Sequence, residues 1–251
     1  MKLINKNIII TGSEGIIGKS FQKYCKRKGY NLFCIDIKNI NRKNYYKCDI
    51  TDEKSVKTTI EKILKKSKID ALINNASFNP KVETKLKSFK FSNYKYSSWK
   101  NGLNVDLNGT FLTSKYLLRY FEKFNKGSII NISSIYGIVG PDQSIYSEKS
   151  KKYFGYKPLE YSVSKAGIIG FTKALAAFYS NTNIKINCLI FGGVKNNQNK
   201  KFIKKYTSKT VIGRMASINE YNNYLDFFIS KKNSYCTGSC IIIDGGATSI
   251  L

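Results

Sequence analysis

Tyr161 and Lys165 are the residues of this chain best suited to acid–base chemistry. They stand four positions apart at the start of a segment with helical periodicity, so their side chains share one helix face. A free tyrosine titrates near about 10, which is too high for proton exchange at neutral pH, but a nearby ammonium lowers that pKa. The pair therefore predicts a general acid/base. Because this spacing is common, it gains weight only from the motifs around it.

Three glycines form a candidate phosphate-binding loop. Gly12, Gly15 and Gly18 follow an apolar run and precede a helical segment, so they permit a tight turn, a close backbone approach to a pyrophosphate and close helix–strand packing. The helix N-terminus would offer N–H groups to the anion. Asp36 ends the next apolar run, where an acid would bind the ribose hydroxyls of a dinucleotide.

The charges near this loop bear on the choice of dinucleotide. Asp36 would repel the 2′-phosphate of NADP, and Glu14 would add to the repulsion. Lys38, Arg42 and Lys43 stand nearby and favour the opposite choice. We expect NAD, with NADP left open.

The elements that must position these residues alternate along the chain. Helical periodicity marks residues 15–29, 52–66 and 159–179. Short apolar runs, typical of strands, occupy residues 8–10, 32–35, 71–73, 128–132, 184–189 and 240–243. Strands that alternate with helices of this length predict an α/β fold, with a parallel sheet covered on both faces.

No linker, repeat or composition break divides the chain, so we expect a single domain over residues 1–251. Residues 82–98 and 141–158 look irregular, and the lysine-rich residues 195–209 suggest a mobile lid. Because ligand-facing loops follow the strands of such folds, we expect substrate loops at about 141–158 and 195–215.

Composition narrows the range of partners. The chain has 43 Lys plus Arg against 16 Asp plus Glu, a net charge of +27. The lysines are spread along the chain, so we expect no nucleic-acid partner but a surface that favours an anionic small molecule. The absence of histidine argues against zinc sites and histidine-based triads, so no metal is expected. Scattered cysteines, no signal segment and no membrane-spanning apolar run predict a cytoplasmic location.

Several further motifs occur in one order with the glycine loop and the Tyr161 pair. They are Asn74-Asn75-Ala76-Ser77, Asn131-Ile132-Ser133-Ser134 and Thr237-Gly238 followed by Asp244-Gly245-Gly246. Together they resemble the short-chain dehydrogenase/reductase family over nearly the whole chain. The resemblance implies a Rossmann-type, doubly wound domain with a seven-stranded parallel sheet, an NAD(P)-dependent oxidoreductase activity and a homodimer or homotetramer.

The resemblance also implies roles for individual residues. Tyr161 would exchange a proton with the substrate, Lys165 would hold the nicotinamide ribose and lower the Tyr161 pKa, and Ser134 would orient the carbonyl. Asp106, the fourth expected catalytic residue, stands where the family has an asparagine that helps to hold a proton-relay water. Its carboxylate could still accept a hydrogen bond from that water, or it could instead pair with Lys165 and weaken the hold of Lys165 on Tyr161. The cofactor-binding residues expected from the loop and the resemblance are Gly12, Glu14, Gly15, Ile16, Ile17, Gly18, Asp36, Ile37, Asp49, Ile50, Asn75, Ala76, Ser77, Tyr161, Lys165 and Val194.

Some features depart from the usual family pattern. The glycine spacing is that of the longer, sugar-nucleotide branch, Ser77 replaces a glycine, and Phe191 replaces a proline. The segment between Ser134 and Tyr161 is long, and it resembles a subset associated with flagellin modification and nonulosonic-acid biosynthesis. That likeness implies a sugar or sugar-phosphate substrate.

The leading prediction is an enzyme that transfers hydride between NAD(H) and a secondary alcohol or ketone. The expected substrate is an anionic sugar of surface-glycan biosynthesis. One alternative is a sugar-nucleotide epimerase or dehydratase that recycles NAD, which the glycine spacing favours. Another alternative is a non-catalytic dinucleotide-binding protein, which is suggested by the departures from the family pattern at Asp106 and Phe191.

Overall fold

The sheet has seven parallel strands in the order β3-β2-β1-β4-β5-β6-β7. The computed structural model describes residues 6–79, 90–146, 156–230 and 232–250. The strands are β1 (Asn7–Thr11), β2 (Asn31–Asp36), β3 (Tyr45–Lys47), β4 (Ala71–Asn74), β5 (Gly127–Ser134), β6 (Ile184–Phe191) and β7 (Cys240–Ile243). Every apolar run predicted as a strand lies in one of them. The α/β prediction with a seven-stranded parallel sheet is confirmed.

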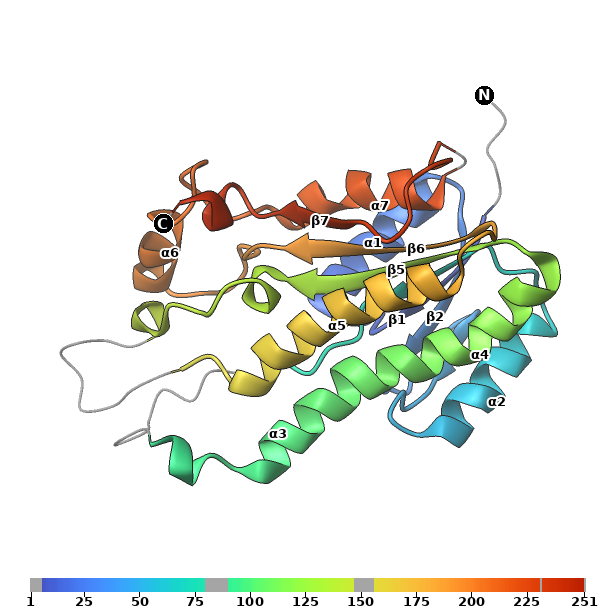
Figure 1. The fold of residues 1–251 in the computed structure, drawn as a ribbon, viewed down its shortest axis with the longest axis horizontal. Helices are drawn as coiled ribbons and strands as arrows, with labels where there is room; N and C mark the ends of the chain where they lie inside the picture. Colours follow the sequence, from blue (N-terminus) through green and yellow to red (C-terminus); the bar gives the residue numbers. More distant parts are fainter. Residues whose placement is uncertain (1–5, 80–89, 147–155, 231, 251) are drawn as a thin grey trace.

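Helices cover both faces of the sheet (Figure 1). They are α1 (Ile16–Arg27), α2 (Glu53–Leu64), α3 (Tyr96–Leu103), α4 (Gly109–Phe124), α5 (Leu159–Phe178), α6 (Lys200–Thr207) and α7 (Asn222–Ile229). Alternate side chains of β1 face opposite layers, because side chains of a strand alternate between the two faces. Ile9 packs in the core formed with α2 and α4, whereas Ile8 and Ile10 pack in the core formed with α1 and α7.

β3 is the strand that the apolar runs did not reveal. It is three residues long, Tyr45 to Lys47, and it lies at the edge of the sheet. Its two tyrosines are half-buried and its lysine is exposed, so no continuous apolar run marks it. Only its pairing with β2, where Cys34 lies opposite Tyr45, defines it as a strand.

The segments expected to be irregular contain more helix than predicted. Of residues 82–98, those from Tyr96 on belong to α3, and residues 80–89 lie outside the described part. The lysine-rich segment 195–209 holds α6, whose Tyr206 packs against Ile145 and Met215. Of the insert 141–158, residues 147–155 lie outside the described part. Local polarity misled the prediction because one face of each short helix finds a tertiary partner.

The strand order reverses between β1 and β4, since β2 and β3 lie on one side of β1 and β4 to β7 on the other. In open α/β sheets, ligands bind at this point, beyond the carboxyl ends of the strands. α6 lies beyond the carboxyl ends of β6 and β7 (Figure 1). The fold therefore places the glycine loop after β1 and the residues after β4, β5 and β6 around one crevice.

Candidate active site

A cavity of about 1430 Å³ occupies this crevice. It brings together residues that follow all of the first six strands. Of the predicted catalytic and cofactor-binding residues, it is lined by Gly12, Glu14, Gly15, Ile16, Ile17, Asp36, Ile37, Asp49, Ile50, Asn75, Ala76, Ser77, Ser134, Tyr161, Lys165 and Val194. Gly18 and Asp106 do not line it.

The glycine loop is shaped for a close approach of its backbone to a ligand. Gly12 has φ of +60°, and a Cβ there would lie 2.6 Å from Ala76 Cα. A Cβ on Gly18 would collide with the carbonyl oxygen of Gly12, so Gly18 serves the packing of α1 on the loop. Gly15 caps α1 without any side-chain hydrogen bond. The first N–H groups of α1, which have no partner within the helix, thus adjoin the cavity and suit a phosphate.

Thr11 ties this loop to the end of β4. Its hydroxyl oxygen accepts hydrogen bonds from the backbone N–H groups of Asn75 and Ala76, each at 3.1 Å. The Asn75 amide in turn donates to the carbonyl oxygens of Thr11 and Gly12, at 3.1 and 3.0 Å. The Asn75-Ala76 motif therefore holds the phosphate loop in place.

Two acids stand at the end of the cavity beyond β1 and β2. Asp36 accepts hydrogen bonds from the backbone N–H of Glu14 at 2.8 Å and of Lys38 at 3.2 Å. The Glu14 carboxylate forms an ion pair with Arg42 at 2.8 Å. The Arg42 guanidinium also lies 5.2 Å from the centre of the Tyr45 ring. Arg42, which favoured NADP in the sequence, is therefore engaged by an acid and an aromatic ring.

Tyr161 and Lys165 occupy successive turns of α5 and face the cavity, as their spacing predicted. Lys165 is 3% exposed, and its Nζ lies 5.6 Å from the centre of the Tyr161 ring. The Nζ donates to the carbonyl oxygen of Ile132 at 3.2 Å. Burial acts to lower the pKa of Lys165, but the Asp106 carboxylate, with smaller contributions from Tyr161 and Cys188, acts in the opposite direction and the pKa is raised. Lys165 therefore remains an ammonium beside Tyr161 at neutral pH.

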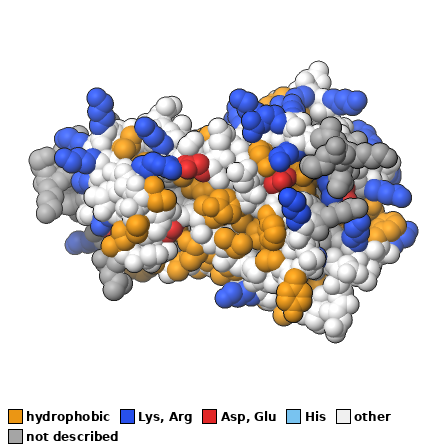
Figure 2. Space-filling view, turned by 90° about the horizontal axis from the view of Figure 1, so that it is seen from above, with side chains coloured by type: hydrophobic (Ala, Val, Ile, Leu, Met, Phe, Trp, Pro, Cys, Tyr) orange, Lys and Arg blue, Asp and Glu red, His pale blue; other side chains and the backbone are white. Residues whose placement is uncertain are grey.

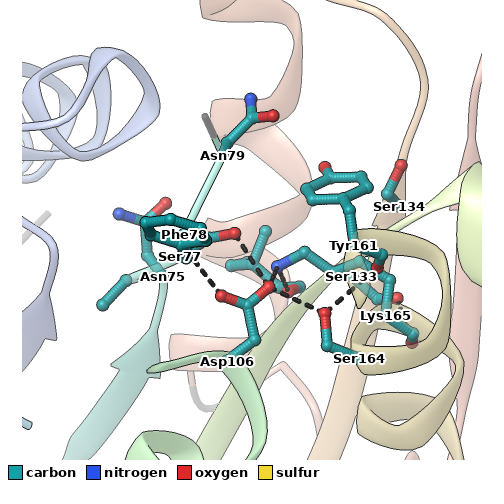
Figure 3. Close-up of polar contacts among 12 residues, drawn as sticks. Asn75, Ser77, Phe78, Asn79, Asp106, Ser133, Ser134, Tyr161, Ser164 and Lys165 are labelled. Carbon is teal, nitrogen blue, oxygen red and sulfur yellow. Dashed lines mark hydrogen bonds and ion pairs between the residues drawn. The ribbon is translucent and has the colours of Figure 1, made fainter. Parts of the chain in front are cut away.

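Asp106 lies behind the cavity wall and is fully buried. Its carboxylate is 3.4 Å from Lys165 Nζ and accepts hydrogen bonds from Phe78 N–H at 2.6 Å and from the hydroxyls of Ser77 and Ser164, each at 3.0 Å. Figure 3 shows the Lys165 side chain directed toward it. The pairing considered from the sequence is thus present in the structure.

Ser134 ends β5 and lines the cavity on the side of Tyr161. Its hydroxyl oxygen accepts a hydrogen bond from Tyr136 N–H at 3.3 Å, which leaves the hydroxyl hydrogen able to donate to a substrate. The neighbouring Ser133 donates to the Lys165 carbonyl oxygen at 2.8 Å and so anchors α5 to β5. Ser134 is therefore the serine suited to substrate contact.

The sequence analysis did not single out several residues of the cavity wall, although Tyr146, Lys157 and Tyr206 lie within the expected substrate loops 141–158 and 195–215. Tyr136 and Tyr146 share a hydrogen bond of 2.8 Å between their hydroxyl oxygens, and Tyr206 accepts a hydrogen bond from Gly193 N–H. Lys157 lies with its Nζ 3.7 Å from the centre of the Tyr161 ring. Two signals in the sequence could have indicated Lys157: it precedes Tyr161 by four positions, and it lies in the expected substrate loop 141–158. Tyr136 and Tyr146 are ten positions apart after β5, whereas Tyr206 belongs to the distant helix α6, so no local pattern shows that the three meet.

The glycine loop, Asp36 and the side chains of Ser134, Tyr161 and Lys165 line one crevice. This arrangement is that of a dinucleotide-binding oxidoreductase of the Rossmann type. A family model described as "Enoyl-(Acyl carrier protein) reductase" matches residues 17–248. The chain belongs to the short-chain dehydrogenase/reductase family. Members of this family use nicotinamide cofactors, and the chain is an oxidoreductase of this kind.

Two relatives of named function align with nearly the whole chain. It is 31% identical to post-translational flagellin modification protein A of Campylobacter coli, over 97% of this chain and 98% of that protein. It is 29% identical to 3-oxoacyl-[acyl-carrier-protein] reductase FabG of Thermotoga maritima, over 98% and 99%. The first of these relatives supports the likeness to the flagellin-modification subset.

Solved structures show the same fold with bound dinucleotides. A short-chain dehydrogenase from Leptospira borgpetersenii with bound NAD+ superposes with a TM-score of 0.86 at 31% identity, covering 97% of this chain and 93% of that one. ElxO with NADP bound superposes with a TM-score of 0.82 at 26% identity, covering 98% and 100%. In the described part of the chain, no helix is long and apolar enough to cross a membrane.

Proposed function

We propose that this protein transfers hydride between NAD(H) and a secondary alcohol or ketone on a small anionic substrate. The observation that carries the proposal is the convergence of Ser134, Tyr161 and Lys165 on the cavity that also contains the glycine loop and Asp36. When bound, the nicotinamide supplies or accepts the hydride. The protein would bind and orient the reactants and move the proton.

Tyr161 Oη is the proposed site of proton exchange with the substrate oxygen. The Lys165 ammonium, 5.6 Å from the centre of the Tyr161 ring, supplies a positive charge beside the reacting hydroxyl and would hold the ribose next to the nicotinamide. Ser134 donates a hydrogen bond to the same substrate oxygen and so fixes the carbonyl. Asp106 acts through Lys165 as a positioning residue rather than by touching substrate.

NAD is the proposed cofactor. The Asp36 carboxylate faces the cavity end where an adenosine ribose would lie, and a 2′-phosphate there would meet a negative charge. Arg42 is paired with Glu14 and is therefore not oriented to bind that phosphate. The Leptospira relative has NAD+ bound and ElxO has NADP bound, so relatives support both choices and the preference rests on these acids.

A sugar or sugar phosphate of surface-glycan biosynthesis is the proposed substrate. The flagellin modification protein of Campylobacter coli supports it. The loops at about 141–158 and 195–215 would contact the substrate, since Ile145, Tyr146, Lys157, Phe202 and Tyr206 all line the cavity beyond β5 and β6.

The test is cofactor binding followed by turnover. Purified protein is titrated with NAD(H) and NADP(H), and reduced-nicotinamide absorbance is then followed with sugars, sugar phosphates and nucleotide sugars. NAD(H) preference with net turnover that Tyr161→Phe abolishes supports the proposal. NADP(H) preference contradicts the cofactor choice, and turnover retained by Tyr161→Phe contradicts the role of Tyr161.

A retained-cofactor reaction is the second candidate, and the glycine spacing at 12, 15 and 18 favours it. An epimerase or dehydratase of this kind would bind NAD tightly and produce no net absorbance change. Product analysis by mass spectrometry and NMR would then show a rearranged or dehydrated sugar.

A homodimer or homotetramer is the proposed assembly, and two faces support it. The first is a groove between α4 and α5 lined by Phe111, Leu118, Phe171 and Phe178. The second contains the edge strand β7 and α7, with Ile242 and Phe227 exposed. Figure 2 shows a band of apolar side chains between groups of lysine and arginine on the face seen there. Burial of two apolar faces is what a tetramer requires.

A further inference from the structure

Lys157 is a buried ammonium that the mechanism above does not use. Its side chain lines the cavity, yet the residue is 7% exposed. Its Nζ donates a hydrogen bond to Asn79 Oδ1 and lies over the Tyr161 ring, 3.7 Å from the ring centre. A lysine ammonium has three donors, and the asparagine uses one of them.

The backbone around Lys157 is clamped by Gln143. The Gln143 side chain accepts a hydrogen bond from Lys157 N–H at 2.8 Å and donates to the Lys157 carbonyl oxygen at 3.4 Å. Gln143 belongs to a short helical turn capped by Asp142, and Asp142 forms an ion pair with Lys209 at 2.6 Å. The two ends of the insert 141–158 are thus joined, and the joint places Lys157 against Tyr161.

No carboxylate in the described part of the chain neutralises Lys157. Asp106 lies behind the cavity wall and forms an ion pair with Lys165. Glu160 accepts a hydrogen bond from the Tyr94 hydroxyl and does not line the cavity. Among the described residues, the acids that line the cavity are Glu14, Asp36 and Asp49, which lie at or just after the ends of β1, β2 and β3. Lys157 instead stands beyond β5, across the sheet from all three.

Burial of the Lys157 ammonium without a bound anion costs free energy. Buried charges in proteins are normally paired, since an ammonium loses its hydration in the interior. Burial, with the Lys165 ammonium next in importance, lowers the pKa of Lys157 to about 8, while Asp106 and Glu160 act in the opposite direction. The aromatic face of Tyr161 and the Asn79 amide oxygen compensate only in part.

We propose that Lys157 is the specificity-determining residue that binds a carboxylate or phosphate of the substrate. Because its Nζ lies over the ring that carries the reacting hydroxyl, the anion belongs within a few bonds of the carbon that gains or loses hydride. The site therefore fits a keto or hydroxy acid or a small sugar phosphate, with the charge near the reacting carbon. It does not recognise the diphosphate of a distant nucleotide. The inference rests on the proposed function, because it takes Tyr161 as the reacting group.

A labelling experiment tests the anion site without any turnover. The protein with NAD bound is treated with an amine-acetylating reagent, and modification of each lysine is measured by mass spectrometry with inorganic phosphate, acetate or chloride at equal ionic strength. We expect phosphate or acetate, but not chloride, to protect Lys157, with Lys57 on the exposed face of α2 as the internal control. Protection by one anion alone identifies a phosphate or a carboxylate. Equal labelling in all three salts overturns the proposal.

A kinetic experiment separates substrate binding from an effect on Tyr161. Wild type, Lys157→Met, Lys157→Arg and the control Lys57→Met are assayed with charge-matched pairs, such as keto acids and their methyl esters or sugar phosphates and the parent sugars. We expect Lys157→Met to raise KM for the anionic member about tenfold or more, with partial recovery in Lys157→Arg and little change for the neutral member. Equal loss of kcat on both members would show that Lys157 acts through Tyr161 and would overturn the proposal. If wild type turns over neither member of any pair, the proposed function itself fails, and the labelling result still decides the anion site.

Discussion

Lys165 Nζ lies 3.4 Å from Asp106 Oδ2, and both side chains are almost completely buried. The pair joins α5 to the turn of π-helix at Asn104–Asn108, which continues into α4. Two further partners of Asp106, Ser77 and Phe78, come from the segment after β4. One carboxylate therefore connects three elements of the cavity wall while it keeps Lys165 charged.

Asp106→Asn tests this connection. The amide cannot neutralise the buried Lys165 ammonium, so we expect the free energy of unfolding to fall by about 3 kcal/mol. The pKa of Lys165 is raised by the pair, so the stabilisation is present at neutral pH and is lost only as pH rises through that raised value. Chemical denaturation across the pH range measures it. A strong rise in turnover in the variant would show instead that the native aspartate impairs the proton relay.

Tyr161→Phe removes the hydroxyl that exchanges the proton and leaves the ring. We expect turnover to fall by about 10²–10⁴-fold, the usual contribution of a general acid/base. NAD(H) affinity should remain, because the glycine loop and Asp36 are untouched. Steady-state rates and fluorescence titration of NADH measure the two effects. Loss of both in parallel would indicate a folding defect, which circular dichroism would reveal.

Asp36→Asn tests the preference for NAD. The amide keeps an acceptor for the N–H of Glu14 or Lys38 but removes the charge, so the loop should keep its shape. We expect kcat/KM with NADP(H) relative to NAD(H) to rise about tenfold or more. Glu14→Gln should have a smaller effect because Arg42 already neutralises Glu14. If Asp36→Asn left the ratio of the two kcat/KM values unchanged, other residues would discriminate between NAD(H) and NADP(H).

Lys157→Met should stabilise the protein in the absence of substrate. The folded-state pKa of Lys157 is about 8, below the unfolded value of about 10.4, so folding penalises the charged form. The penalty is full below about pH 8, declines as pH rises between these two values and disappears above both. We expect a gain of a few kcal/mol at neutral pH that vanishes in strongly alkaline solution. Denaturation curves of both proteins at several pH values measure it, and an equal gain at every pH would indicate a packing effect.

Phe178→Glu tests the groove between α4 and α5 as an interface. Phe178 is 79% exposed on α5, and a charge there should be buried unpaired if two copies meet on this face. We expect the molar mass from light scattering to fall by half. Tyr235→Glu, at a fully exposed aromatic outside the groove, is the matched control. An unchanged mass in the Phe178 variant would exclude this face as the interface.

Local sequence patterns were sufficient to predict most of the fold, the glycine loop and the Tyr161–Lys165 pair. Runs such as residues 184–189 and helical periodicity such as residues 159–179 reflect neighbours within one element, so they predicted β6 and α5 to within two residues. The glycine spacing and the four-residue step from Tyr161 to Lys165 are equally local. β3 escaped because its three residues become a strand only through pairing with β2.

The charges around Tyr161 were decided by the tertiary structure. Asn79 and Lys157, and Asp106 and Lys165, are partners from segments far apart in the chain. Gln143 and Lys157 meet across the insert 141–158. The sequence shows which of these residues are charged, and it raised the Asp106 pairing as one alternative among others. Whether a lysine is hydrated or buried over an aromatic ring depends on where crossover connections bring separate strands and loops together. That placement sets the dielectric surroundings and the counter-charges, and through them the charge that the cavity presents to a substrate.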